Sequence, residues 1–133
     1  MDSGFVKTEI NGDGLAVVTF GHPAHNSLPL GLLDQLSKQI HTAGSHPDVR
    51  LILLQSAGER TFCAGASFDE LLSITDIDAG TVFFSGVADV INAIRTSQKL
   101  IIGRAQGKAV GGGVGLIAAC DYCFATAQTA VKL

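Results

Sequence analysis

The sequence predicts an α/β fold, in which buried strands alternate with amphipathic helices. The short continuous apolar runs Arg50–Gln55 and Leu100–Arg104 are typical of strands that are buried on both faces of a sheet. Between them, apolar residues recur at helical spacing over Ala79–Thr96. The second run leads into the glycine turn Gly111–Gly113 and a further apolar stretch, which indicates a strand, a sharp turn and a helix in succession. This alternation favours a single layered α/β unit.

Length, composition and charge narrow the class of protein. The chain has 133 residues, of which 47% are hydrophobic and 16% are charged, and this length suffices for one domain with its own core. Because charged residues are few, we expect a large buried or partner-covered area. The net charge is -3, and the nine lysines and arginines are scattered along the chain. This distribution argues against a nucleic-acid-binding protein.

No segment of the sequence indicates export or membrane insertion. Residues Met1–Gly4 have neither the basic region nor the apolar region of a secretory signal, and they lack the arginines of a transit peptide. We therefore expect a cytoplasmic protein. The charge-free run Ala109–Cys120 is shorter and richer in glycine than a bilayer-spanning helix, which needs roughly 20 apolar residues. We expect no transmembrane segment.

The three cysteines predict neither a disulfide framework nor a metal site. Cys63, Cys120 and Cys123 are an odd set, unlike the cysteine pattern of a small secreted domain. Cys120 and Cys123 form a C-x-x-C pair, but no second pair and no histidine at a suitable spacing completes a zinc site. We expect all three cysteines to be small hydrophobic residues of the core.

The N-terminal residues predict a β-hairpin. Two strand-like runs, Phe5–Ile10 and Leu15–Phe20, flank the segment Asn11-Gly12-Asp13-Gly14. Asn-Gly between apolar runs is the strongest short-range hairpin signal, because both residues tolerate positive φ.

A loop and a helix follow the hairpin. Residues 21–28 have the composition of a loop, and Ser27 or a neighbouring residue can cap the helix. Pro29 stands near the first turn, where its missing N–H costs no hydrogen bond, and the helix ends near Gly44. Its apolar positions recur at helical spacing: Leu33, Leu36 and Ile40.

Caps and apolar stripes predict the remaining elements. Ser67 and Glu70 fit a capping box, in which Ser67 is the N-cap and the Glu70 side chain bonds back to it. The helix over Ala79–Thr96 carries an apolar stripe that we expect in the core, formed by Phe83, Val87, Val90, Ile91 and Ile94. A helix over Gly112–Ala119 precedes a final strand, Tyr122–Ala125.

Three segments of the chain carry a specific pattern of small residues. The first is Phe62-Cys63-Ala64-Gly65-Ala66-Ser67-Phe68, which is similar to an F-x-A-G-x-D/S-hydrophobic pattern. The second is Gly107–Leu116 followed by Ala119-Cys120-Asp121, which is similar to a G-x-x-x-G-G-G-x-x-L…C-D pattern. The third, His25-Asn26-Ser27-Leu28, resembles an N-A-L loop. In this order and spacing, they resemble the enoyl-CoA hydratase/isomerase (crotonase) superfamily, many members of which carry asparagine in place of Gln106.

The resemblance implies a crotonase-like ββα spiral, incomplete at its C-terminus, with residues 1–133 as the N-terminal part of a single acyl-CoA-binding domain. Crotonase-like enzymes bind acyl-CoA thioesters and stabilise an enolate at the thioester oxygen, which requires two backbone N–H donors about 3 Å from that oxygen. The resemblance places these catalytic donors on Ala66 and Gly112. Each donor lies at the start of a predicted helix, whose dipole favours a negative oxygen.

The resemblance also implies contacts with the rest of the substrate. Coenzyme A is part of that substrate, so no separate cofactor is implied. The segments similar to those that hold adenine and pantetheine contain Ala24, His25, Ala64, Ser67 and Phe68. Gly111 adjoins the donor Gly112 and is counted with the substrate-binding residues. Asp69 lies in the first turn after Ala66, where it either faces the acyl group or is a charge favoured at a helix N-terminus.

The catalytic carboxylates of a hydratase are absent from the pattern. Hydration of an enoyl thioester calls for a general base and a general acid, and the first glutamate of hydratase members corresponds to Gly115. Gly115 lies three residues after Gly112 and therefore on the same helix face, directed toward the same site. The second glutamate of the family falls a few residues beyond the position of Leu133. We expect Asp121 to be structural, bonding backbone groups at the helix-to-strand junction.

We therefore expect an acyl-CoA-processing enzyme of the hydratase/isomerase type, a lyase or an isomerase. The alternative is a non-catalytic, truncated acyl-CoA-binding or assembly module, which the absent carboxylates favour. The resemblance spans residues 5–133 but only about half of a typical family member. It implies an acyl-CoA thioester as ligand, no nucleic-acid or membrane partner, and a homotrimer or hexamer for the full-length form.

Overall fold

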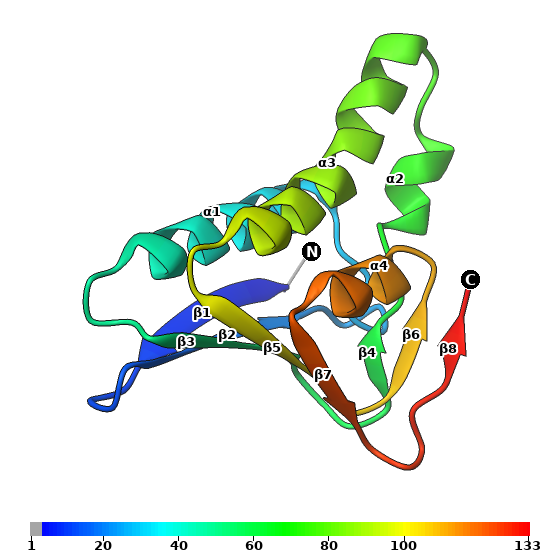
Figure 1. Ribbon diagram of the computed structural model, residues 1–133. Helices are drawn as coiled ribbons and strands as arrows, with labels where there is room; N and C mark the ends of the chain where they lie inside the picture. Colours follow the sequence, from blue (N-terminus) through cyan, green and yellow to red (C-terminus); the bar gives the residue numbers. More distant parts are fainter. Residues whose placement is uncertain (1–3) are drawn as a thin grey trace.

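Two β-sheets and four helices make up residues 4–133, which the computed structural model describes (Figure 1). The larger sheet has five strands, in the spatial order β1 (Phe5–Ile10), β2 (Leu15–Gly21), β3 (Leu51–Ser56), β5 (Leu100–Ala105) and β7 (Tyr122–Ala125). The smaller sheet consists of β4 (Thr61–Cys63), β6 (Lys108–Val110) and β8 (Val131–Lys132). Strands β1 and β2 pair antiparallel, and the other pairings are parallel.

The order of the elements is that of a ββα spiral. From β3 onward, strands come in pairs, and the first strand of each pair joins the larger sheet while the second joins the smaller sheet. Helices follow the strand pairs at three places along the chain: α1 (Leu30–Ser45), α2 (Phe68–Leu72) with α3 (Ile77–Thr96), and α4 (Gly112–Ala119). The predicted α/β fold and its ββα spiral are confirmed.

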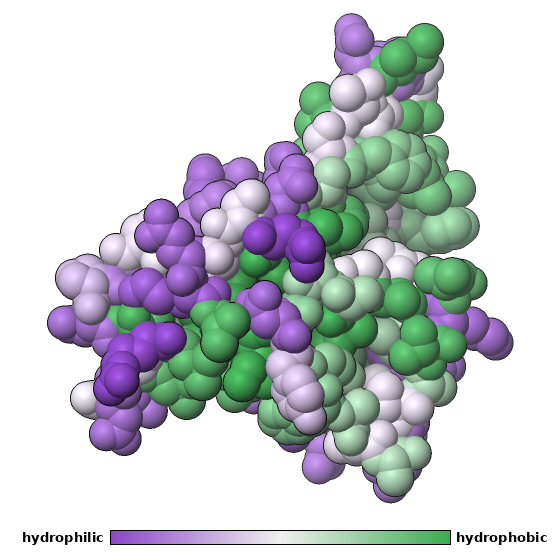
Figure 2. Space-filling model, viewed as in Figure 1, coloured by the Kyte–Doolittle hydropathy of each residue, from purple (hydrophilic) through white to green (hydrophobic). Residues whose placement is uncertain are grey.

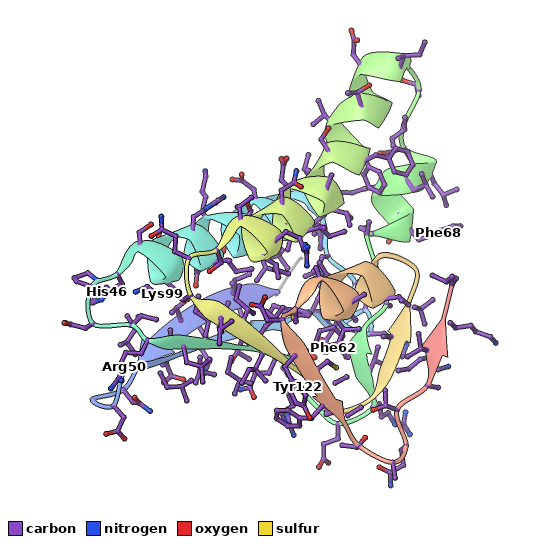
Figure 3. All side chains as sticks on the ribbon, in the orientation of Figure 1. His46, Arg50, Phe62, Phe68, Lys99 and Tyr122 are labelled. Carbon is purple, nitrogen blue, oxygen red and sulfur yellow. The ribbon has the colours of Figure 1, made fainter. Side chains whose placement is uncertain are left out.

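The core lies between the larger sheet and the helices α1, α3 and α4 (Figure 1). The predicted apolar positions of α1 are buried, and so are Phe83, Val90 and Ile94 of α3. Phe62, which is labelled in Figure 3, is fully buried and meets Phe20 edge to face, with ring centroids 5.5 Å apart. The N-terminal half of α3 projects beyond the sheets together with α2 (Figure 1).

Three strands were not predicted from the sequence. Strands β4, β6 and β8 are only three, three and two residues long, which is too short for an alternating pattern to be recognised. The burial of β3 and β5 also differs from the prediction. In both strands, buried residues alternate with half-buried or exposed ones, because α1 and α3 cover one face of the sheet and the described residues cover the other face only in part.

The β1–β2 turn differs in its details from the predicted Asn-Gly turn. Neither Asn11 nor Gly12 has a positive φ; instead Gly14 has a φ of 91°. The Asn11 side chain stabilises the turn, because its Oδ1 accepts the Asp13 and Leu15 N–H groups at 2.9 and 3.0 Å. The hairpin itself is confirmed, with Ile10 opposite Ala16.

Two helix starts lie close to their predicted positions. Helix α3 begins two residues before the predicted Ala79, because the Asp76 side chain caps it by accepting the Ala79 N–H at 2.7 Å. Helix α1 has Pro29 as its N-cap, which offers no side-chain hydrogen bond, so Ser27 is not the cap.

Helix α3 also bears on the expectation of no membrane segment. By length and composition alone, its 20 residues could cross a bilayer. A single helix of this kind is weak evidence, since helices of soluble cores pass the same test. Here α3 packs along α1, where Gly86 allows close approach: a Cβ at this glycine would lie 2.8 Å from Cδ1 of Leu30.

The three cysteines do not share one environment. Cys63 is buried and Cys120 is half-buried, as expected for core residues, but Cys123 is exposed. The prediction was wrong for Cys123 because β7 is the last strand of the larger sheet and all four of its residues are exposed. Asp121 behaves as predicted: its Oδ2 accepts the Ile101 N–H at 2.8 Å, which joins the end of α4 to β5.

Candidate active site

The loop after β4 determines the direction of the Ala66 N–H. Ala66 forms an isolated parallel bridge with Leu28, in which the Leu28 N–H donates to the Gly65 carbonyl at 2.8 Å and the Ser67 N–H donates to the Leu28 carbonyl at 3.1 Å. Backbone groups of successive extended residues point to opposite sides, so the Ala66 N–H points away from Leu28. Within residues 4–133 it donates to no protein acceptor.

Gly65 brings this loop into contact with the glycine turn before α4. Its φ of 92° lies in the left-handed region that favours glycine, and its N–H donates to Sγ of Cys63 at 3.3 Å. A Cβ at Gly65 would lie 3.2 Å from both the Gly112 nitrogen and the Val110 carbonyl oxygen. The loop that carries the first predicted donor therefore touches the turn that carries the second.

The structure requires glycine at two positions of the triplet, for a different reason at each position. Gly111 is the N-cap of α4 with φ 56° and ψ -123°, a conformation that glycine adopts without strain. A side chain at Gly113 would collide with the carbonyl oxygen of Cys63. Gly112 does have room for a methyl group, since a Cβ there would lie 3.5 Å from Cγ1 of Val87. The triplet is thus a specifically shaped turn and not a flexible link.

The Gly112 N–H lies at the start of α4. The first N–H groups of a helix have no acceptor inside the helix. The neighbouring Gly111 N–H donates to the Lys132 carbonyl at 2.9 Å, and the Val114 N–H donates to the Gly111 carbonyl at 3.0 Å. Among the described residues, the Gly112 N–H has no acceptor. The helix dipole adds partial positive charge at this end.

Gly112 and Gly115 share one face of α4, and this face is turned toward α3. A Cβ at Gly115 would lie 3.0 Å from Cδ1 of Ile91, and a Cβ at Gly112 would contact Val87. The shared face agrees with the predicted spacing. The space beside Gly115 is filled by the Ile91 side chain, so a larger residue at this position would require Ile91 to move.

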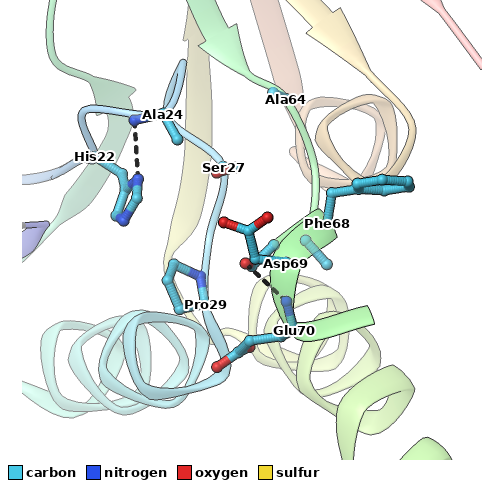
Figure 4. A pocket seen from close by; sticks show the side chains of 10 residues that line it. His22, Ala24, Ser27, Pro29, Ala64, Phe68, Asp69 and Glu70 are labelled. Atoms are coloured by element: carbon cyan, nitrogen blue, oxygen red, sulfur yellow. Dashed lines mark hydrogen bonds between the residues drawn. The ribbon is translucent and has the colours of Figure 1, made fainter. Parts of the chain in front are cut away.

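The Ala66 loop lines a pocket of about 530 Å³, which the loop between β2 and α1 faces from the other side (Figure 4). Six of the predicted site residues line this pocket: Ala24, Ala64, Ala66, Ser67, Phe68 and Asp69. The other predicted residues do not: His25, Gly111, Gly112 and Gly115. Four lining residues were not predicted as site residues: His22, Ser27, Pro29 and Glu70.

Asn26 shapes the loop on one side of the pocket. It has a positive φ of 57°, which asparagine tolerates better than most residues, and it is 6% exposed. Its Oδ1 accepts the His22 N–H at 2.9 Å, and its Nδ2 donates to the Ala57 and Thr61 carbonyls at 2.8 Å each. The preceding residue, His25, also has a positive φ and is exposed. The sequence signal for this role was asparagine within a loop.

Glu70 does not close the predicted capping box. Ser67 is the N-cap of α2, and its Oγ accepts the Glu70 N–H at 3.3 Å, as predicted. The Glu70 side chain instead accepts the Leu30 N–H at 2.7 Å. It therefore caps α1, whose own N-cap residue, Pro29, provides no side-chain acceptor. A local sequence pattern does not reveal this contact, because Leu30 and Glu70 are 40 residues apart.

The charged side chains that line the pocket are acidic. Asp69 directs its carboxylate into the pocket toward Ser27 (Figure 4), and Glu70 lies at the side of α1. His22 accepts the Ala24 N–H at its Nδ1, 3.0 Å away. Within the described part of the chain, no three His, Cys, Asp or Glu residues are grouped so that they could hold a metal ion.

Comparison with known proteins finds relatives of this chain. The family model described as enoyl-CoA hydratase/isomerase matches residues 10–132. The 3-hydroxyisobutyryl-CoA hydrolase of Xenopus laevis is 32% identical over 99% of this chain, which covers 36% of that relative. The human methylglutaconyl-CoA hydratase is 34% identical over 81% of this chain, which covers 32% of that relative. The chain thus spans about a third of the length of these curated relatives.

The solved structures agree with this result. An enoyl-CoA hydratase of Mycobacterium smegmatis has a TM-score of 0.88 and 26% identity, over 95% of this chain and 49% of the hydratase. The match over nearly the whole chain, in both sequence and fold, shows that the chain belongs to the enoyl-CoA hydratase/isomerase family.

Proposed function

We propose that the chain is an acyl-CoA-processing enzyme that stabilises a thioester enolate with the N–H groups of Ala66 and Gly112. One observation carries the proposal: two loops distant in sequence meet at Gly65, and each presents an N–H that has no acceptor among the described residues. Paired donors of this kind stabilise negative charge that develops on an acyl oxygen. Family membership supports an acyl-CoA thioester as the substrate class.

In the proposed complex, the pantetheine arm lies in the pocket and the thioester oxygen reaches the two N–H groups. Ala66 lines the pocket and Gly112 lies behind Gly65, so the carbonyl would be held at the inner end. Proton loss next to the thioester, or addition of water to an enoyl double bond, shifts negative charge onto this oxygen. Hydrogen bonds from the two donors stabilise the state in which the thioester oxygen is negatively charged. Coenzyme A is substrate here, and no separate cofactor is proposed.

A second candidate is a module that binds acyl-CoA without turning it over. It is favoured by Gly115, which offers no carboxylate at the position where hydratase members of the family carry one. In this case the donors would hold the ground-state thioester oxygen, and the chain would lack a group to transfer the proton.

One experiment separates the two candidates. The chain is mixed with a short enoyl-CoA, the absorbance of the conjugated thioester is followed, and coenzyme A is titrated calorimetrically in parallel. Loss of the absorbance with saturable kinetics supports the enzyme. Binding without any change in absorbance supports the module, and the absence of both binding and turnover overturns both candidates.

The donor role of Gly112 is tested by a matched pair of substitutions. Gly112→Pro removes the N–H at a helix position that tolerates proline, whereas Gly112→Ala keeps the N–H and meets only ordinary contacts, 3.5 Å from Cγ1 of Val87. We expect the proline variant to lose roughly 100- to 1000-fold in kcat and the alanine variant to stay near the parent.

The same two variants test the second candidate, for which the measured quantity is the affinity for acyl-CoA in place of kcat. Gln39→Ala is a control at a position outside the candidate site, since Gln39 lies in the second half of α1 and bonds Thr8 and Val6 of β1. Equal activity or affinity in the proline and alanine variants would contradict the assignment of Gly112 as a donor.

A further inference from the structure

The pocket has an unusual charge for a site that is to hold coenzyme A. None of the nine lysines and arginines of the chain lines it. Its titratable lining residues are His22, Asp69 and Glu70. The nucleotide end of coenzyme A carries several negative charges on its phosphates, whereas the pantetheine arm is uncharged. The acidic side chains of the pocket therefore repel the phosphates of the nucleotide end, whereas they do not repel the uncharged pantetheine arm.

The two carboxylates differ in whether the protein already holds them. The Glu70 carboxylate already accepts the Leu30 N–H, which ties it to the start of α1. The Asp69 carboxylate has no hydrogen bond or ion pair with any residue of the described part, and it points into the pocket beside Ser27 (Figure 4). Its charge is therefore not offset by an ion pair with a cation among residues 4–133.

We propose that Asp69 is a specificity residue that makes the pocket favour the uncharged pantetheine part of a thioester and disfavour phosphate groups. The ligand class that fits best is a pantetheine thioester whose nucleotide is absent or lies outside the pocket. This inference rests on the proposed function, since it assigns a selectivity to the same site. Because Asp69 is exposed, its repulsion acts partly through water and weakens with salt.

Binding of coenzyme A and of pantetheine to the 133-residue chain tests the inference. Both ligands are titrated calorimetrically against the parent and Asp69→Asn, at about 20 mM and about 500 mM salt, which bracket strong and weak screening. We expect Asp69→Asn to bind coenzyme A roughly two- to five-fold more tightly at low salt, the range of exposed charge pairs. Pantetheine affinity should not change, and the gain should vanish at high salt. Asp69→Lys should bind coenzyme A more tightly still.

Asp13→Asn is the matched control. It removes the same charge from the β1–β2 turn, which lies at the far end of the molecule from α2 (Figure 1), and it should leave the ratio of the two affinities unchanged. Binding of both ligands with the same ratio in the parent, Asp69→Asn and Asp69→Lys would overturn the inference while the proposed function stands. If neither ligand binds the parent chain, the proposed function fails, and the inference fails with it.

Discussion

At the scale of single residues, the side-chain amides of Asn26 and Gln106 donate hydrogen bonds to backbone carbonyls of the segment from β3 to β4, which leads to the candidate site. The Thr61 carbonyl accepts Nδ2 of Asn26 at 2.8 Å and Nε2 of Gln106 at 3.2 Å. Gln106, which is 4% exposed, also donates to Oγ of Ser56 and to the Gly58 carbonyl. A tight strand connection cannot satisfy its own carbonyls through a ladder. These amides satisfy them and so position β4, from which the Ala66 loop continues.

The buried thiol of Cys63 gives stability a dependence on alkaline pH. Burial raises the pKa of Cys63 from 9.0 to about 12, against the lowering effect of the Gly65 N–H. Between these values the unfolded chain loses the thiol proton while the folded chain keeps it, so the free energy of unfolding falls as pH rises. The contribution is complete below about pH 9, and the slope attributable to Cys63 is about 1.4 kcal/mol per pH unit.

Urea denaturation from pH 8 to pH 11 measures this slope. Cys63→Ala should have a shallower decrease than the parent. Cys123→Ala, at an exposed position, should resemble the parent more closely. Cys120, whose pKa is also raised to about 12, mainly by burial, adds a slope of its own in every variant. Identical slopes for the parent and Cys63→Ala would rule out a proton held by this thiol.

From the sequence alone, the small residues of the loop after β4 could be expected to lie together at one side of a pocket. Ala64 and Ala66 belong to a contiguous segment, so their place in the pocket could be expected from the pattern. The sequence does not reveal that Glu70 caps α1 or that Asn26 supports the His22 loop, because the partners of these side chains come from distant segments. The packing of Gly115 against Ile91 likewise depends on how α3 crosses α4.

At the scale of elements, Glu70 joins α2 to the start of α1. The first N–H groups of α1 need acceptors, and Pro29 supplies none from its side chain. Glu70 fills this role from across the pocket, so α2 and the Ala66 loop are held at a fixed distance from α1. Elements as short as α2 and β4 are positioned by such tertiary contacts, which explains why their surroundings were harder to predict than those of α1 and α3.

Replacement of Glu70 measures the strength of this link. Glu70→Ala leaves the Leu30 N–H without its acceptor and should lower the free energy of unfolding by about 1–2 kcal/mol, as for other lost caps. Glu70→Gln keeps an acceptor and should lose less. Asp34→Ala, which removes an exposed i,i+4 pair with Lys38 at 2.9 Å, should cost about 0.5 kcal/mol or less. Urea denaturation provides the values, and a Glu70→Ala cost no larger than that of Asp34→Ala would contradict the link.

At the scale of the whole molecule, large apolar side chains remain exposed in two regions. Hydrophobic residues gather on the projecting end of α2 and α3 and around the C-terminal strands (Figure 2). The most exposed of them are Phe68, Leu72, Ile77, Phe84, Tyr122, Val131 and Leu133. Contiguous exposed apolar surface of this kind marks contact sites in soluble proteins. The low fraction of charged residues led to the same expectation from the sequence.

We expect the chain to associate with itself through the projecting end of α3, in line with the predicted trimer or hexamer of the full-length form. Phe84 is 63% exposed and lies edge to face with Phe83 at 5.1 Å, which holds its ring in place. Covering such a ring contributes about 1–2 kcal/mol, roughly tenfold in an association constant. In sedimentation velocity at increasing concentration, the parent should therefore show species larger than the 13.7 kDa monomer. Phe84→Gln should shift the balance toward monomer, whereas Ala88→Ser, at an exposed position of the same helix, should not. A parent chain that sediments as a monomer at every concentration would refute this association.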